Sequence, residues 1–273
     1  MTVTSNPIRT IERKAALESC YTAFYRHEQG CRFFEHCSDG LVDKFPNGYR
    51  FSKTVSLGVH YDLTIDGLDV RILFIGKEGR SGRNALRQPA RLTDFREEKK
   101  VNLHYRETYK MLCEMLGYNY ENGKLKDHSK FLCKPDANLA CYALTNLYRC
   151  AFKQHDSDVK SIPNTKAQTA NCLTILREEL RILEPTVIIL QKADLRAVHI
   201  APDAIVVEKA CGLYVSESLQ AYLIETSHPS NFGKWYRESK PRFSRAVNAL
   251  RARGALPAQG SDTTDLLNTL VNT

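Results

Sequence analysis

Four short apolar runs, spaced between stretches of helical pattern, restrict the possible folds of this chain more than any other feature of the sequence. The runs lie at residues 70–75, 140–144, 186–190 and 222–225. Runs of this length are typical of strands buried on both faces of a parallel sheet. Helical patterns cover residues 8–28, 104–117, 166–183 and 241–253. Because strands alternate with helices, the sequence predicts an α/β fold whose central parallel or mixed sheet is flanked by helices on both faces.

The chain shows no internal repeat and no break in composition, so residues 1–253 are expected to form a single domain. Its first part, about residues 1–65, is expected to be a helical extension that carries cysteines. Within it, apolar residues alternate over 53–65, which predicts a hairpin or an edge strand. The C-terminal tail, residues 254–273, is small and polar, and we expect it to be flexible.

The net charge of +8 and the pI near 9.0 fit a polyanionic partner such as DNA, although a solvated basic face would give the same numbers. No apolar run approaches the roughly 20 residues of a membrane span. The first residues lack the charged segment and apolar core of a secretory signal. We therefore expect a cytoplasmic monomer that binds no membrane.

A polar side chain follows three of the apolar runs. Glu78 comes after the first run, Asn146 after the second and His228 after the last. Since open α/β sheets bind ligands at the carboxyl ends of their strands, these residues predict a single site. A carboxylate can deprotonate water, an amide can read a base edge, and an imidazole can hydrogen-bond a leaving group. Singly, they could equally be a surface glutamate, a turn-capping asparagine and a structural histidine.

Three motifs carry a resemblance to a known family. They are, in chain order, Gly76–Gly79, Thr145–Cys150 and His228–Ser230. Their order along the chain and their sequence context resemble those of the conserved motifs of the uracil-DNA glycosylase superfamily. Asn146 followed by Cys150, and the helix that bears Cys172, are most similar to the iron–sulfur branch of that superfamily. The resemblance covers roughly residues 70–250 and implies the α/β fold of the superfamily.

This resemblance implies a monofunctional DNA N-glycosylase, a hydrolase that flips a nucleotide out of the stack and leaves an abasic site. Glu78 would hold the attacking water, and His228 would donate to the base O2 as negative charge develops there. Asn146 would read the base edge. The residues expected to bind the base are Gly76, Arg80, Asn146 and Phe95, with Tyr105 as a second candidate for stacking.

The segment after His228 is expected to contact DNA. In the superfamily an apolar side chain at this place wedges into the base stack, and Phe232 takes that place here, with Trp235 as a second candidate. Basic residues around the wedge would meet phosphates. The expected DNA-binding residues are Ser230, Phe232, Lys234, Trp235 and Arg237.

Arg80 departs from the pattern of the uracil-specific members, which often carry a tyrosine two residues after the acid. That tyrosine blocks substituents at C5, so the arginine indicates a base that is bulky at C5, such as a (glucosylated) hydroxymethylcytosine of phage DNA, and a role in anti-phage defence. Uracil excision in DNA repair is the alternative, because the Asn146 amide can flip and pair with either base. A non-catalytic DNA-binding module is the alternative of another class. A metal-dependent nuclease is disfavoured, because Glu78 is the acidic residue that stands out near the strand ends.

The cysteines suggest a metal site. Cys150 and Cys172 match two ligands of the iron–sulfur branch, while Cys31 and Cys37 are six residues apart, where the branch normally has a closer pair. With Cys20 as an alternative upstream ligand, four thiolates would suit a structural [4Fe–4S] cluster, and zinc is the second candidate. The cysteines expected to be small buried hydrophobes are Cys113, Cys133, Cys141 and Cys211.

Overall fold

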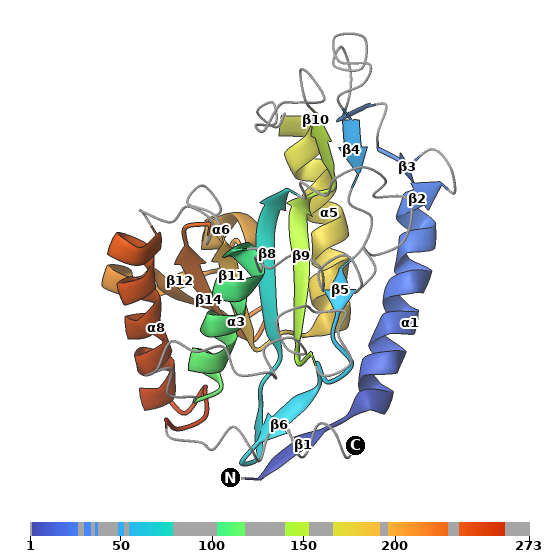
Figure 1. Cartoon of the computed structure of the whole chain (residues 1–273). Coiled ribbons are helices and arrows are strands. Elements are labelled where there is room, and N and C mark those ends of the chain that lie inside the picture. The colour runs from blue at the N-terminus through green and yellow to red at the C-terminus, as the bar shows by residue number, and fades with distance from the viewer. Residues whose placement is uncertain are drawn as a thin grey trace.

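The computed structural model describes residues 2–26, 30–33, 36–37, 49–51, 55–78, 103–117, 140–152, 166–191, 196–228 and 235–259. In this part of the chain the main sheet has seven strands in the order β12-β13-β14-β11-β8-β9-β5 (Figure 1). Their bounds are β5 Ser56–Leu57, β8 Ile72–Glu78, β9 Tyr142–Tyr148, β11 Val187–Gln191, β12 Ile205–Glu208, β13 Leu213–Ser216 and β14 Ala221–Thr226.

The centre of the sheet is parallel and its margins are antiparallel. β9, β8, β11 and β14 run parallel to one another, whereas β5, β12 and β13 pair antiparallel. The central strands are buried on both faces, which is why they read as continuous apolar runs. The prediction of a mixed α/β sheet is confirmed, and the carboxyl ends of four strands lie at the same edge.

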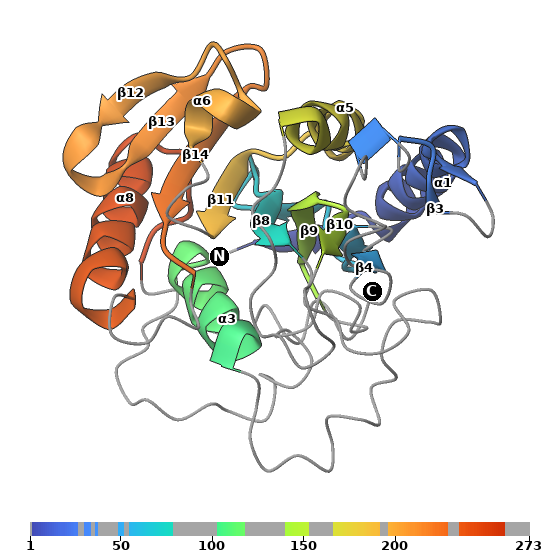
Figure 2. The same cartoon turned by 90° about the horizontal axis from the view of Figure 1, so that it is seen from above.

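Helices cover both faces of the sheet. They are α1 Pro7–Phe24, α3 Leu103–Met115, α5 Lys166–Leu183, α6 Ala197–Ile200 and α8 Lys240–Ala252, with a 3-10 helix η2 Lys209–Cys211 and a π-helix η3 Trp235–Ser239. Seen from above, α3 and α8 lie on one side of the sheet and α1, α5 and α6 on the other (Figure 2). Alternate residues of β8 enter the two cores: Phe74 faces α3, and Leu73 faces α5. The predicted helices at both ends of the chain and at 166–183 are confirmed.

Smaller sheets attach the N-terminal region. They are β1 Val3–Ser5 with β6 Leu63–Ile65 and β7 Leu68–Asp69, β4 Tyr49–Phe51 with β10 Cys150–Phe152, and β2 Tyr25–Arg26 with β3 Gly30–Cys31. Within the stretch predicted as a hairpin or edge strand, β5 is an edge strand of the main sheet and β6 belongs to another sheet. The edge-strand interpretation of residues 53–65 therefore holds for Ser56–Leu57 alone, and the hairpin interpretation was wrong, because β6 pairs with β1 and β7 and not with β5.

The packed structure continues past Gly254. Leu256 is buried in the core on the α3 face, and Arg251 Nε donates to the carbonyl of Pro257 at 3.0 Å. The part of the predicted flexible tail up to residue 257 is thus held in place. In the described residues, no helix has the length and apolar character needed to cross a membrane.

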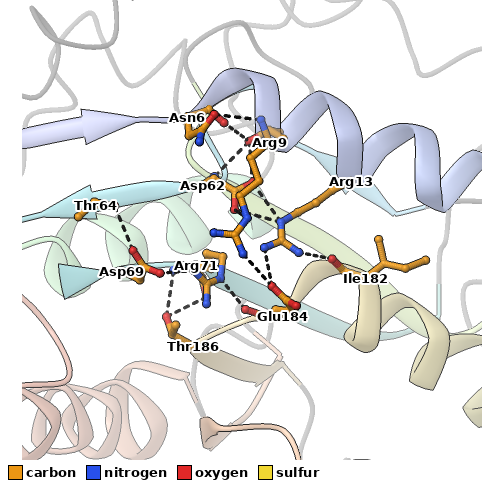
Figure 3. A network of polar contacts seen from close by, with 11 residues as sticks. Asn6, Arg9, Arg13, Asp62, Thr64, Asp69, Arg71, Ile182, Glu184 and Thr186 are labelled. Carbon is orange, nitrogen blue, oxygen red and sulfur yellow. Dashed lines mark hydrogen bonds and ion pairs between the residues drawn. The ribbon is translucent and has the colours of Figure 1, made fainter. Parts of the chain in front are cut away.

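An ionic network fixes the start of α1 to the sheet (Figure 3). Asn6 caps the helix by accepting from the Arg9 backbone N–H at 3.0 Å. Arg13 pairs with Asp62 at 3.0 Å and with Glu184, just after α5, at 2.8 Å. Arg71, at the start of β8, donates to the carbonyl of Glu184 at 2.6 Å. The network joins α1, α5 and β8 at the end of the sheet opposite the strand carboxyl ends.

Arg13→Ala is expected to lower the free energy of unfolding by roughly 3–5 kcal/mol, because it leaves the carboxylate of Asp62 buried without its main partner. The side chains of Arg13 and Asp62 are only 7% and 5% exposed. Urea unfolding followed by circular dichroism measures the change.

Arg9→Ala is the matched control. Arg9 meets the same two carboxylates, but its side chain is 47% exposed, so its removal should cost less than about 1 kcal/mol. Equal losses in the two variants would contradict a buried ion pair as the main anchor of α1.

Candidate active site

The register of the parallel strands aligns polar residues at their carboxyl ends. Gly76 of β8 lies opposite Asn146 of β9. On the other side of β8, Ile75 lies opposite Leu190, which places Gln191 of β11 beside Gly76. Gln191 in turn lies opposite Thr226 of β14. The resulting row across four strands is Asn146, Gly76, Gln191 and Thr226.

All four residues of this row belong to the α3 face of the sheet. In each strand the residue two positions earlier packs with the core on that face, and residues two apart in a strand share a face. These preceding residues are Leu144, Phe74, Ile189 and Ile224. The predicted reader of the base edge and the predicted glycine therefore occupy one surface.

Asn146 lies directly over Gly76. A Cβ atom built on Gly76 would be 2.4 Å from Asn146 Oδ1, a distance at which something must move. The group that approaches Gly76 closely in this structure is the Asn146 amide, and the contact of Gly76 with a base stays a prediction. That amide is half-buried and makes no hydrogen bond with another described residue.

Glu78 ends β8, and His228 follows the end of β14 at the same edge. The backbone of Glu78 pairs with Tyr148 at the end of β8, two residues beyond Gly76. His228 is half-buried and follows Thr226 by two residues. The preceding residue, Ser227, is held by Ser239 at the entry to α8, whose hydroxyl lies 2.7 Å from the Ser227 hydroxyl. The fold thus brings the backbones that carry the three predicted groups to one edge.

Trp235 has a structural position. It is 1% exposed, and its indole N–H donates to Glu107 of α3 at 3.1 Å. Glu107 also accepts from Tyr236 at 2.7 Å and from Lys110 at 2.8 Å, and these bonds lower the pKa of this buried carboxyl although burial alone would raise it. Trp235 therefore anchors the segment before α8 to α3 and is not available as a wedge in this conformation. The predicted phosphate contact Arg237 is exposed.

A buried ion pair lies behind Asn146, on the α5 face. Arg149 Nη2 meets Glu179 Oε2 of α5 at 2.5 Å, and both side chains are fully buried. Thr145, the neighbour of Asn146, accepts from Arg149 at 3.0 Å and donates to Glu179 at 2.9 Å. Tyr21 of α1 donates to the other oxygen of Glu179 at 2.5 Å. The network joins α1 and α5 to the strand that carries Asn146.

Three of the predicted metal ligands lie at this corner. The pKa of the Cys172 thiol is raised to about 11 by the sum of several effects. Burial raises it most, the backbone N–H and guanidinium of Arg149 lower it, and the nearby Cys37 and Cys31 raise it by less. Cys37 Sγ accepts from Asn171 at 3.2 Å, and Cys172 Sγ accepts from the Arg149 backbone N–H at 3.5 Å. In the described residues, no three His, Cys, Asp or Glu side chains stand close enough to hold a metal ion as they are.

Cys150 follows Arg149 directly and its backbone begins β10, but its side chain lies outside the described residues. The predicted buried cysteines on the α3 face behave as expected. Burial raises the pKa of the Cys113 and Cys141 thiols to about 12, so both stay protonated, and Cys211 is buried with them. The remaining predicted positions fall outside the described residues: Arg80, Phe95, Cys133, Ser230, Phe232 and Lys234.

Gln191 was not among the site residues predicted from the sequence. The apolar run was read as ending at Leu190, and the polar residue that follows was not considered. The signal that identified Asn146, a polar side chain directly after a buried strand, would have identified Gln191 as well.

Gly76→Ala is expected to destabilise the protein by about 0.5–1.5 kcal/mol, because the new methyl group overlaps Asn146 Oδ1 and forces the Asn146 side chain out of its conformation. In an Asn146→Ala background the same change should cost little, since the overlapping atom is gone. The coupling energy from a double-mutant cycle in urea measures the contact. Additive effects of the two substitutions would show that Asn146 does not lie over Gly76.

Comparison with known proteins gives one family and no curated relative. The family model described as the uracil DNA glycosylase superfamily matches residues 66–251, more than half of the chain. The match spans all four central strands and the residues Gly76, Asn146 and His228. No curated protein matches the chain significantly. The chain belongs to the uracil-DNA glycosylase superfamily.

Proposed function

We propose that this protein is a DNA glycosylase that flips out a pyrimidine bulky at C5 and hydrolyses its N-glycosidic bond, leaving an abasic site. Superfamily members are DNA N-glycosylase hydrolases that bind DNA, so membership supports the reaction class. We propose as well that this base is a modified cytosine of phage DNA and that the protein acts in anti-phage defence. A basic chain of net charge +8 suits a DNA partner.

One observation carries the proposal: the Asn146 amide extends over the bare backbone of Gly76, at the edge where the backbones of Glu78 and His228 also end. An amide with no hydrogen bond to another described residue is ready to pair with a ligand. Ligands of open α/β sheets bind at this edge. Asn146 would therefore read the polar edge of a base extruded from the duplex.

Glu78 and His228 would act on opposite sides of the N-glycosidic bond. Glu78 would orient and deprotonate water and stabilise the positive charge that develops on the sugar. His228 would donate a hydrogen bond to O2 of the departing base, where negative charge accumulates. Phe232 would fill the gap left in the base stack, since Trp235 is buried.

Arg80 supports a C5-modified base over uracil. An arginine in place of the tyrosine that blocks C5 leaves room for a substituent, and a guanidinium can donate to the hydroxyls of an attached sugar. A hydroxymethylcytosine, with or without glucose, has both features. Uracil is the second candidate, because the Asn146 amide pairs with either base after a flip.

We further propose that Cys31, Cys37, Cys150 and Cys172 hold a [4Fe–4S] cluster. The N–H groups directed at Cys37 and Cys172 support it, because N–H···S bonds stabilise cluster thiolates. Cys31 and Cys37 also lie near enough to Cys172 to influence its pKa, but the described thiols would have to move closer together to bind a cluster. When bound, the cluster would supply a structural cross-link and no chemical step. It would tie the segment after α1 to β10 and α5.

Duplexes carrying uracil, hydroxymethylcytosine or its glucosylated form, with mass spectrometry of the released bases, test the reaction. The wild type is expected to release a modified cytosine and leave an alkali-labile site. Glu78→Gln should slow release by about 10²–10⁴-fold and His228→Ala by about 10²–10³-fold. Release of uracil alone would contradict the role given to Arg80.

Glu217→Gln and His199→Ala are matched controls, because both residues are exposed: Glu217 follows β13 at the opposite edge of the sheet, and His199 lies in α6 on the α5 face. They should leave the rate unchanged. If the wild type binds these duplexes but leaves each of them alkali-stable, the protein is a DNA-binding module and not a glycosylase.

Cys172→Ala is expected to abolish the iron and acid-labile sulfide of the purified protein, because it removes a ligand in the buried corner. Cys141→Ala should retain both, since Cys141 is buried on the opposite face of the sheet. Elemental analysis of anaerobically purified protein measures iron and zinc together. Zinc in place of iron would support the second candidate, and iron retained by Cys172→Ala would contradict the ligand set.

A further inference from the structure

We propose that Gln191 is a second amide that contacts the target base, on the opposite side of Gly76 from Asn146, and that it helps to determine which base is accepted. The proposal rests on the glycosylase function proposed above and adds a specificity residue to it. Its basis is the position of Gln191 in the sheet, its burial and its incomplete hydrogen bonding.

Gln191 occupies the same row of the sheet as Asn146. It is the last residue of β11, lies beside Gly76 and faces α3. Neighbouring strands are about 4.8 Å apart, so the backbones of Asn146 and Gln191 are separated by about 10 Å. The position between them is a glycine, so no side chain separates the two amides on this face. Once the Asn146 side chain turns away from Gly76, which it now covers, a pyrimidine held above the glycine would lie within reach of both amides.

The hydrogen bonding of Gln191 is incomplete. Its side chain is fully buried, and Nε2 donates to the hydroxyl of Thr108 on α3 at 2.9 Å. Oε1 is buried and has no hydrogen-bond partner among the described residues. A buried polar atom without a partner destabilises the folded state unless a ligand or an ordered water supplies one. The edge where the base is expected to bind is the place where such a ligand would come from.

Thr108 fixes Gln191 without fixing which amide atom is free. A hydroxyl donates and accepts, so it can pair with Nε2 or, after a 180° turn of the amide, with Oε1. Gln191 can therefore offer an acceptor to the exocyclic amine of a cytosine or a donor to O4 of a uracil. Asn146 has the same choice, and the two amides together select a pattern of donors and acceptors that neither selects alone.

Gln191→Leu and Thr108→Val separate base reading from packing. Both break the Gln191–Thr108 bond, but only Gln191→Leu removes the amide. We expect Gln191→Leu to lower kcat/KM for the preferred base by about 10–100-fold. The ratio of kcat/KM for the preferred base to kcat/KM for the other base should change with it. Thr108→Val should change the rates for both bases by the same factor. Urea unfolding of each variant shows that it is folded.

Binding to duplexes with a non-cleavable 2′-fluoro nucleotide gives a readout that does not need catalysis. The wild type should bind the duplex with the base more tightly than one with an abasic analogue, and Gln191→Leu should lose most of this difference. The proposal is overturned if Gln191→Leu and Thr108→Val have the same ratio of kcat/KM for the two bases and the same preference for the base in binding. Gln191 would then be an anchor for α3.

Failure of the glycosylase function would give a different result. In that case the wild type releases no base from any duplex, and the binding measurement still decides the role of Gln191. A base preference that Gln191→Leu abolishes would support the contact, and equal binding by wild type and variant would refute it.

Discussion

The parallel register of β9, β8, β11 and β14 is the constraint on which the site depends. It places the ends of four strands at one edge and aligns Asn146, Gly76 and Gln191 on the α3 face. The glycine in the middle matters because any side chain there would occupy the space that Asn146 fills. Since a slip of one residue in any of these pairings would turn the polar group to the opposite face, the cores on both sides of the sheet protect the site.

The buried Arg149–Glu179 pair connects this edge to the cysteine-bearing corner. A buried pair stabilises a fold only when further hydrogen bonds satisfy its remaining groups. Here Thr145 and Tyr21 supply such bonds from β9 and α1, while Arg149 Nε is buried without a hydrogen-bond partner among the described residues. The pair therefore holds together the helices that frame the cysteines and the strand that presents Asn146. This arrangement gives a physical reason why a cross-link at the corner would matter to a site on the other face of the sheet.

The sequence predicted the long periodic elements and the central strands, because burial on one or both faces leaves a clear pattern of apolar residues. It did not predict β13 or the pairing of the short strand β5, since two- to four-residue strands carry too little pattern. Trp235, the second candidate for the wedge after Phe232, proved to be buried, because its partner Glu107 lies on a helix far away in sequence. Gln191 was missed because its significance depends on the register with β8, which only the assembled sheet shows.

The central claim is that a base taken out of DNA binds over Gly76 between two amides. A crystal structure of Glu78→Gln with a duplex carrying the preferred base tests it most directly, because this variant is expected to bind the base without releasing it. The account predicts the base outside the duplex, hydrogen-bonded to Asn146 and Gln191, with the His228 imidazole beside O2. A base that stays stacked in the duplex, or DNA bound at another edge of the sheet, would contradict it.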